Sequence, residues 1–459
     1  MTDMLKQKQL KEPKSKGAVR MTEGPIGKKI IFFAIPLFWG NLFQQLYNTA
    51  DSLIVGNFLG SDALAAVSSS SSLIFLMVGF FNGVFMGSGV VVSRNYGAKR
   101  YEKLSKAVHT AVALALVAGV LLTIIGMVLS PILLRLMGTP EDVMPNSVAY
   151  FKTYFLGSLG FIMYNCMVGI LQSVGDSKHP LVYLIISSIV NVCLDLLFIG
   201  VFGMGVEGAA YATVIAQFLS AILCLIHLLR IDAEYKITLS KVGFDKEILG
   251  TILRYGLPSG VQNSIISLAN VVVQSNINAF GKMAMAGSGS YSKIEGFGFL
   301  PVNCFSMSLT TFISQNLGAK EYERAEKGAK FGIMCSAGLA ELIGVVIFIF
   351  APVLVGMFDS NPEVVAFGVT HARTVTLFYG LLAFSHCCAA ILRGAGRAMV
   401  PMYIMLSIWC VLRITYITLI VKIVPVISAI YWAYPLTWFI SSVLFLVYLL
   451  KSDWLYSFN

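Results

Sequence analysis

Charged side chains are scarce in this 459-residue chain. Asp, Glu, Lys and Arg make up 12% of the residues, and hydrophobic residues make up 57%. An ordinary soluble domain carries roughly 25% charged residues. Six long windows contain no charged residue at all: 63–93, 107–134, 153–175, 208–229, 255–281 and 423–450. Each can cross a hydrocarbon core, which takes about 20 helical residues. The composition excludes a soluble fold and predicts an all-α integral membrane protein.

Metal and catalytic motifs are also missing. The eight cysteines all lie in predicted spans, and their spacing matches neither a disulfide framework nor a zinc motif. His386 stands beside Cys387 and Cys388 without a second ligand cluster, so we do not expect it to bind a metal. His109 and His179 are expected to be solvated loop residues. Because no nucleophile elbow or paired catalytic motif is present, we expect neither enzyme activity nor a cofactor.

Adding the less apolar stretches gives twelve predicted spans, six in each half. They begin near residues 30, 64, 107, 146, 180, 208, 252, 284, 328, 364, 398 and 428. Most of the 33 Lys and Arg fall in the N-terminal tail or in every second loop. This positive-inside pattern predicts that both termini are cytoplasmic. A basic face for nucleic acid would not alternate in this way, so the net charge of +10 does not indicate nucleic-acid binding.

The chain contains a long internal duplication. Residues 93–99 read SRNYGAK and residues 314–320 read SQNLGAK, and the two segments lie 221 residues apart. Each copy follows the second predicted span of its half, and both are basic. An even number of spans per repeat then predicts parallel repeats with a cavity between them. We expect a cytoplasmic basic tail over 1–29, an N-lobe over 30–230, a cytoplasmic linker over 231–250 and a C-lobe over 251–451.

The doubled Gly-Ala-Lys motif, the six-plus-six plan and the first span together resemble the MATE (multidrug and toxic compound extrusion) transporters over about residues 24–450. The first span runs from Pro36 through QQLYNTAD at 44–51 to Gly56. The resemblance implies a V-shaped pair of helical lobes in the plasma (inner) membrane. It also implies secondary active export of amphiphilic or cationic organic compounds against H⁺ or Na⁺. Nothing in the composition demands more than a monomer.

Acidic residues inside spans are costly and usually functional. The N-terminal half has two of them deep in predicted spans, Asp51 and Asp195. Asn191 lies four residues before Asp195 and therefore on the same helix face, and Thr213 lies early in the sixth span. Oxygen ligands of this kind suit a hard cation such as Na⁺. Two nearby buried carboxylates can instead take up a proton. Both alternatives stay open.

The first span carries one polar stripe at helical spacing, formed by Gln44, Tyr47, Asn48 and Asp51. The DNA-damage-inducible-F-like branch of the family resembles this chain in an aspartate on helix one, an Asn-x-x-x-Asp pair on helix five and a threonine on helix six. The resemblance implies that Asp51, Asn191, Asp195, Thr213 and Tyr47 couple the cation. It further implies that Pro36, Gln44 and Asn48 serve the substrate cavity or its gating.

The C-terminal half has no acid that corresponds to Asp51, since residues 256–280 contain only amides among their strongly polar side chains. This absence places the predicted coupling site in the N-lobe. Charged residues do occur in later spans, among them Lys293, Glu295 and Arg413. Because intramembrane charges of opposite sign usually pair, we expect Glu295 to pair with Arg413 or Lys293.

Three functions are compatible with a protein of this kind. The first is the exporter described above. The second is a flippase for a lipid-linked precursor, which would have a strongly cationic cavity and additional helices. The third is a membrane-embedded enzyme, which the missing catalytic motifs disfavour. The substrate, the coupling ion and the resting conformation are not predicted.

Overall fold

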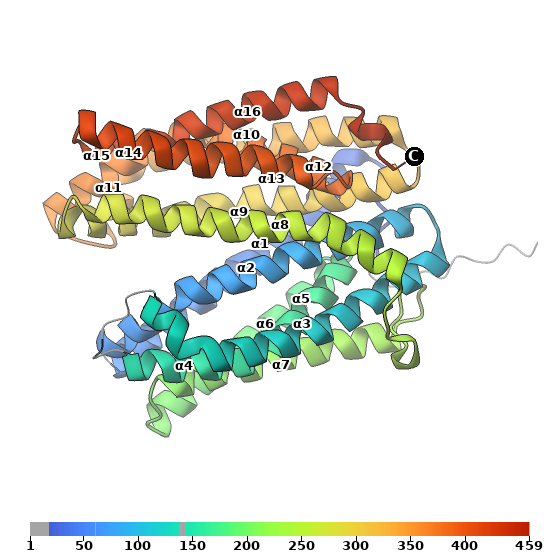
Figure 1. The fold of residues 1–459 in the computed structure, drawn as a ribbon, viewed down its shortest axis with the longest axis horizontal. Helices are drawn as coiled ribbons and strands as arrows, with labels where there is room; N and C mark the ends of the chain where they lie inside the picture. Colours follow the sequence, from blue (N-terminus) through green and yellow to red (C-terminus); the bar gives the residue numbers. More distant parts are fainter. Residues whose placement is uncertain (1–17, 60, 137–140, 142–143, 459) are drawn as a thin grey trace, which may run out of the picture.

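The computed structural model describes residues 18–59, 61–136, 141 and 144–458, which form a bundle of long helices without strands (Figure 1). The helices of the first half are α1 (Ile26–Leu59), α2 (Ser61–Gly97), α3 (Tyr101–Leu136), α4 (Met144–Leu156), α5 (Ser158–Ser173), α6 (Lys178–Asp195), the π-helix η1 (Leu196–Val201) and α7 (Val206–Arg230).

The linker contains the short η2 (Leu239–Lys241), and the second half repeats the pattern with more breaks. Its helices are α8 (Lys246–Asn278), α9 (Lys282–Gly318), α10 (Tyr322–Gly356), α11 (Pro362–Val375), η3 (Thr376–Phe378), α12 (Tyr379–Gly394), α13 (Met399–Met405), the π-helix η4 (Leu406–Leu412), α14 (Arg413–Ile423), α15 (Ile427–Tyr431), α16 (Ala433–Lys451) and η5 (Trp454–Tyr456).

Twelve of these stretches are long enough to span a bilayer. Among the described residues, ten are also apolar enough, and the pair α4–α5, bent by 47°, makes an eleventh. The twelfth is α8, whose amides, among them Gln262, Asn263 and Gln274, make it more polar than the others. The predicted all-α fold with twelve membrane helices is therefore confirmed.

The 221-residue offset of the sequence recurs in the helices. α2 begins at Ser61 and α9 at Lys282, and α7 ends at Arg230 and α16 at Lys451. Lys99 and Lys320 also correspond, because both adopt a left-handed backbone, with φ of 55° and 63°. In each Gly-Ala-Lys motif it is thus the lysine that makes the left-handed turn after the helix, a position that usually takes glycine.

The glycine of each motif instead allows the two halves to touch. A Cβ on Gly97 would overlap the backbone of Gln315, and a Cβ on Gly318 would overlap that of Arg94. Gly83, further back on α2, meets the backbone of α8 in the same way. Small residues let membrane helices approach to backbone distance. Figure 1 shows the two halves together at the end where the C-terminus lies and further apart at the opposite end.

Gln315 in α9 is fully buried and connects several segments at the end where the halves meet. Its Oε1 accepts the backbone N–H of Met21 at 3.0 Å, and its Nε2 donates to the carbonyl of Ser173 at 2.7 Å. The preceding Ser314 donates to the carbonyl of Val90 at 2.8 Å. These hydrogen bonds join the N-terminal segment, α2 and α5 to the second half, and so close the cleft at this end.

Replacing Gln315 by alanine should weaken this closure. The buried N–H of Met21 would lose its partner, and an unsatisfied buried donor costs about 1–3 kcal/mol. We expect Gln315→Ala to speed maleimide labelling of a cysteine placed at Ser177, which lines the cavity near this end. Gln274→Ala is the control, because Gln274 bonds to Asn278 of its own helix. Equal labelling rates in Gln315→Ala and its parent would contradict this role.

The ends of two predicted segments differ from the structure. α1 begins at Ile26, and α8 begins at Lys246, so both start earlier than predicted and the linker is shorter. Asp245 caps α8, because its side chain accepts the backbone N–H of Ile248 at 3.1 Å. That hydrogen bond and the nearby Lys106 ammonium lower the pKa of the Asp245 carboxyl. Residues 1–17 of the predicted basic tail lie outside the described residues.

His109 is not a solvated loop residue, as the sequence had suggested. It is buried in α3, and its Nε2 accepts the backbone N–H of Thr238 in the linker at 2.9 Å. Its Nδ1 lies 2.6 Å from the carbonyl of Ser105, to which it can donate. The helix begins at Tyr101, well before His109, and the linker folds back over the ring. His109 therefore holds the linker against the first half.

Candidate functional site

A cavity of about 900 Å³ lies between the two halves. Its walls come from α1, α2, α5, α6 and α7 on one side and from α8, α9, α12, α13, η4, α14 and α16 on the other. Its lining is rich in hydroxyl and amide side chains, and the amides are Asn41, Gln44, Asn82, Asn165, Gln172, Asn191, Gln217, Gln262, Asn263, Asn270, Gln274 and Asn303. The position of α8 in this wall explains why that helix is polar. Such a lining can solvate many organic molecules without demanding one charge.

Asp51 and Asp195 lie on α1 and α6, two helices of the first-half wall, although neither residue lines the cavity itself. α1 packs against α6, and the two carboxyl groups are within hydrogen-bonding reach of each other. Asp195 is fully buried at the end of α6, where the backbone passes into the π-helix η1. Short π-helical segments are frequent at functional sites. The sequence prediction had these two acids converge, and the structure brings them together.

The oxygens of this pair lack protein donors. Among the described residues, Oδ1 of Asp51 and both carboxylate oxygens of Asp195 are buried without a hydrogen-bond partner. Two ionised carboxylates cannot donate hydrogen bonds to each other. Because their charges repel strongly in an environment of low dielectric constant, the two groups cannot both stay ionised without a cation. The pocket can therefore take up a shared proton or a small cation.

Asn191 and Thr213, on the neighbouring helices α6 and α7, both line the cavity. The amide nitrogen of Asn191 donates to Oγ1 of Thr213 at 3.5 Å, and Thr213 donates in turn to the carbonyl of Ala209 at 3.1 Å. The amide oxygen of Asn191 is buried without a partner in the described part of the chain. Asn191 lies four residues before Asp195 on the same face of α6, and the role of these four residues in cation coupling stays a prediction.

Only some of the residues predicted to be functional on α1 line the cavity. Pro36, Gln44 and Tyr47 line the cavity. The Tyr47 hydroxyl is close enough to hydrogen-bond the Gln44 side chain. Asn48 is exposed and is not among the lining residues, although it was grouped with Pro36 and Gln44 from the sequence.

Three further residues near the carboxylates were missed by the sequence reasoning. Tyr150 and Tyr154 in α4 lie close to Asp51, and Tyr154 is within hydrogen-bonding reach of Gln217 in α7. Oε1 of Gln217 is itself buried without a partner within the described ranges. Gln217 lies four residues after Thr213 and so shares its helix face, a spacing that could have identified it. The tyrosines had no comparable signal among 19 in the chain.

The charges of the second half do not pair as predicted. Arg413 is buried, and its guanidinium donates to Oγ1 of Thr437 at 2.7 and 3.2 Å. It also lies 4.6 Å from the ring centroid of Tyr434. Glu295 accepts from the Tyr291 hydroxyl at 3.4 Å. Glu295 and Arg413 both line the cavity and interact electrostatically, but they form no ion pair at contact distance.

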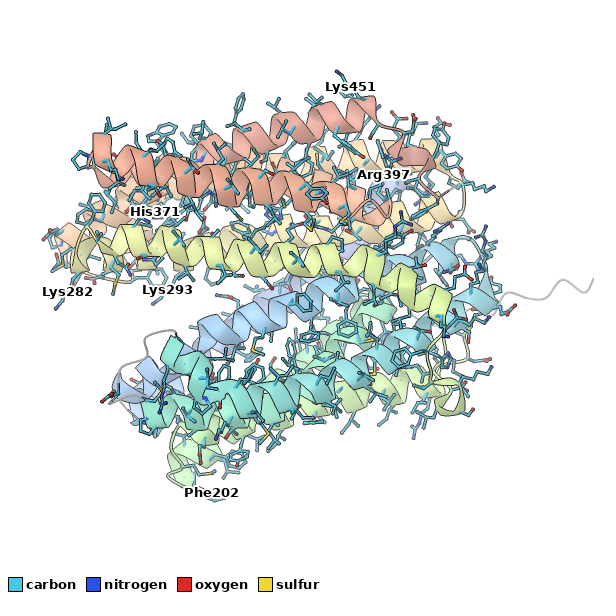
Figure 2. All side chains as sticks on the ribbon, in the orientation of Figure 1. Phe202, Lys282, Lys293, His371, Arg397 and Lys451 are labelled. Atoms are coloured by element: carbon cyan, nitrogen blue, oxygen red, sulfur yellow. The ribbon has the colours of Figure 1, made fainter. Side chains whose placement is uncertain are left out.

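Lys293 is not buried. It is exposed on α9, with its Nζ 5.4 Å from the ring centroid of Phe358, and Figure 2 labels it on the side of the second half nearest the first. Residues two apart on a helix point about 200° apart, so Lys293 and Glu295 project from nearly opposite faces. The expected Lys293–Glu295 pair is therefore wrong for a geometric reason.

Both histidines of the second half, the buried His371 and the partly exposed His386, lie among aromatic rings. The His371 ring stacks on Tyr431 at 3.8 Å between centroids and lies 4.2 Å from Tyr291. The His386 ring lies between Phe299 and Trp409, at 5.8 and 5.4 Å, and lines the cavity. Aromatic packing thus surrounds both rings, and only the His386 ring is part of the cavity wall.

The fold and the cavity define a multi-pass helical membrane protein with a central site for small molecules. The sequence model of the MatE family matches residues 36–197 and 258–419, which is one copy in each half. The chain therefore belongs to the MATE family, whose members are transporters of small molecules and not enzymes.

Related proteins match most of the chain. A probable multidrug resistance protein of Bacillus subtilis, YoeA, is 29% identical over 84% of this chain and 85% of its own. The probable multidrug resistance protein NorM of Thermotoga maritima is 27% identical over 84% and 83%. An FAD transporter of Shewanella oneidensis is 26% identical over 83% and 84%.

Solved structures share the fold. A MOP-superfamily transporter from Pyrococcus furiosus aligns with a TM-score of 0.89 at 24% identity, over 94% of this chain and 96% of that one. The outward-facing conformation of a multidrug resistance MATE family transporter aligns with a TM-score of 0.88 at 24% identity, over 94% and 96%. At this identity the likeness bears on the fold alone.

Proposed function

We propose that this protein is a secondary active exporter of amphiphilic, chiefly cationic, organic compounds. It exchanges them for H⁺ or Na⁺ by alternating access between its two lobes, residues 30–230 and 251–451. The observation that carries the proposal is the pair Asp51 and Asp195, whose buried oxygens lack donors directly behind the cavity wall. The names of the bacterial relatives support a multidrug substrate range.

The coupling ion would bind among Asp51, Asn191, Asp195 and Thr213, with Tyr47 in the wall that separates this pocket from the substrate. A proton would bridge the two carboxylates, and Na⁺ would take oxygens from all four side chains. Either ion neutralises the carboxylates and so changes the packing of α1 against α6 and α7. Pro36 supports such a change, because a proline removes one backbone hydrogen bond from α1.

The orientation of the protein in the membrane follows from the distribution of its basic residues. The Gly-Ala-Lys turns, the linker, the C-terminus and the N-terminal segment around Met21 lie at the end where the halves meet. We assign this end to the cytoplasm of the plasma (inner) membrane by the positive-inside rule. The conformation described here would then be open to the outside, ready to release substrate and bind the ion. A monomer suffices for this cycle.

A flippase for a lipid-linked precursor is the alternative. It would need a strongly cationic cavity, but the ionisable side chains Arg393, Arg413, His386 and Glu295 include only two fixed positive charges and one acid. The two arginines do favour anionic aromatic compounds as a second class of cargo. This matches the relative named as an FAD transporter, so an anionic flavin belongs among the tested substrates.

The test uses purified protein in proteoliposomes under a pH gradient and a Na⁺ gradient, applied separately. A fluorescent organic cation, a flavin nucleotide and a labelled phospholipid serve as cargo. We expect one gradient to drive accumulation of the organic cation. Movement of the lipid alone would favour the flippase, and movement of none of the three under either gradient would count against the exporter.

A further inference from the structure

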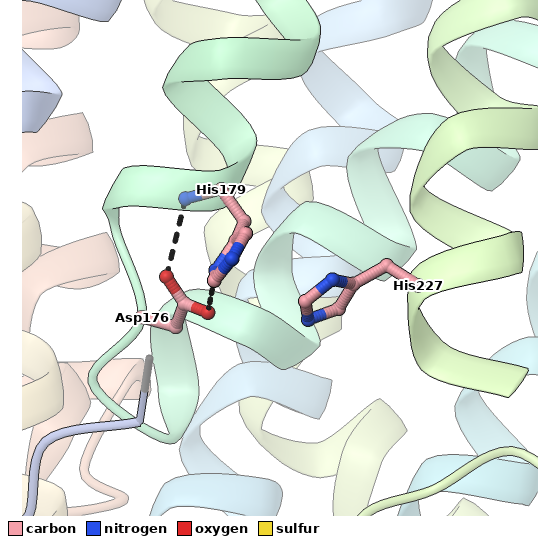
Figure 3. Close-up of side chains that lie close together, drawn as sticks. All are labelled: Asp176, His179 and His227. Carbon is pink, nitrogen blue, oxygen red and sulfur yellow. Dashed lines mark hydrogen bonds and ion pairs between the residues drawn. The ribbon is translucent and has the colours of Figure 1, made fainter. Parts of the chain in front are cut away.

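A second cluster of ionisable side chains lies at the closed end of the first half. Asp176 is in the turn between α5 and α6, His179 is in the first turn of α6, and His227 is near the end of α7 (Figure 3). One oxygen of the aspartate and one nitrogen of each imidazole all lie within 4.8 Å of one another. None of the three residues lines the cavity.

The backbone fixes the carboxylate in place. Gly175 has a left-handed φ of 87°, and a Cβ there would overlap the carbonyl of Val19 from the N-terminal segment. Asp176 is thereby completely buried. Its Oδ1 accepts the backbone N–H groups of Lys178 and His179 at 3.2 Å each, and its Oδ2 lies 2.6 Å from Nδ1 of His179. The aspartate therefore turns one oxygen toward the two imidazole rings.

His227 leaves one nitrogen unused. Its Nδ1 is 3.0 Å from the Tyr183 hydroxyl, and its ring centroid is 4.3 Å from that of His179. Its Nε2 is buried and has no hydrogen-bond partner among the described residues. A buried nitrogen without a hydrogen-bond partner costs free energy, and a bound ligand would remove that cost. Figure 3 shows the ring directed at the Asp176–His179 pair.

Two imidazoles and one carboxylate are a ligand set of Zn²⁺, which often keeps a fourth position for water. Hard ions such as Na⁺, Mg²⁺ and Ca²⁺ prefer sites made of oxygen alone. We propose that Asp176, His179 and His227 form a binding site for a borderline divalent transition metal such as Zn²⁺. The wholly buried, doubly hydrogen-bonded carboxylate distinguishes this cluster from a chance surface grouping.

The metal would connect the start of α6 to the end of α7. These two helices carry Asn191, Asp195 and Thr213 further along their length. A bound ion would thus hold together, at the closed end, the helices that form the pocket beyond. The expected consequence is greater stability of the folded first half, because a ligand that binds only the folded state stabilises it.

The test is Zn²⁺ titration of the purified full-length chain after chelator treatment, followed by calorimetry and by thermal unfolding. We expect one saturable Zn²⁺ per chain and a higher Tm when it is bound. His227→Gln and His179→Gln should each weaken binding by at least about tenfold, which is the lower bound for removing even an outer-shell partner. His109→Gln is the matched control and should bind Zn²⁺ like the parent, since His109 bonds to the linker.

The absence of saturable Zn²⁺ binding would overturn the proposal, and so would unchanged affinity in both His179→Gln and His227→Gln. Asp176→Asn is a weaker test, because Asp176 also accepts N–H groups at the start of α6 and its loss can disturb folding. The two histidine variants leave those bonds in place. A Tm that Zn²⁺ raises equally in the parent and the His227→Gln variant would likewise contradict the site.

Discussion

Replacing Asp195 by asparagine should abolish ion-driven transport while leaving the protein folded. Asparagine has nearly the same shape but cannot share a proton with Asp51 or supply a full negative charge to Na⁺. Coupling free energies between two sites are typically about 1–3 kcal/mol, equivalent to about 5–150-fold in affinity. The dependence of substrate uptake on the ion gradient should therefore disappear in Asp195→Asn, and also in Asp51→Asn, when uptake is measured in proteoliposomes.

The control for this experiment is Asp232→Asn, which changes an exposed acid of the linker. It should transport like the parent. The double variant Asp51→Asn, Asp195→Asn should be no worse than either single variant, because the two carboxylates act as one unit. Full gradient-driven transport by Asp195→Asn would show that the coupling site lies elsewhere.

Adding a side chain at Gly97 should prevent the closed end from forming. A Cβ there would overlap the backbone of Gln315, which has no flexible side-chain atom that can move aside. Overpacking costs typically about 1–3 kcal/mol and more where the obstacle is rigid. We expect Gly97→Val to lower the Tm and to stop transport, because the cavity could no longer close at this end.

Gly338→Val is the matched control for that substitution. Gly338 lies in α10, and a Cβ there would have no neighbour within 4 Å. Valine is a better helix former than glycine, so helix propensity cannot explain a loss of stability in Gly97→Val, and the difference between the two variants reports the contact with Gln315. Similar Tm and transport for Gly97→Val and Gly338→Val would contradict the close contact between α2 and α9.

Much of the architecture could be predicted because short stretches of sequence are enough to recognise it. Apolar length identified the spans, and the repeated Gly-Ala-Lys segments identified the two halves. The role of the motif could not be predicted in the same way. A sequence does not show that Gly97 faces the backbone of Gln315, or that Lys99 takes the left-handed turn, because both depend on how two distant helices pack.

The same contrast holds for the site. Asp51 and Asp195 stand out in the sequence, since a carboxylate in a span is costly and has few explanations. Tyr150 and Tyr154 do not, because a tyrosine in a membrane helix is unremarkable until its neighbours are known. Opposite charge alone could not predict the contacts of Glu295 and Arg413, because these contacts depend on helix packing. Arg413 donates to Thr437 and lies over the ring of Tyr434, and it interacts with Glu295 only at longer range.

An ion at Asp51 and Asp195 and an organic substrate in the cavity should displace each other. The most direct measurement is the equilibrium affinity of the purified protein for a fluorescent organic cation, at two pH values and at several Na⁺ concentrations of constant ionic strength. By linkage, affinity should fall as the coupling ion rises, and Asp195→Asn should lose that dependence. Substrate binding that neither ion affects in the parent protein would contradict this mutual displacement of ion and substrate.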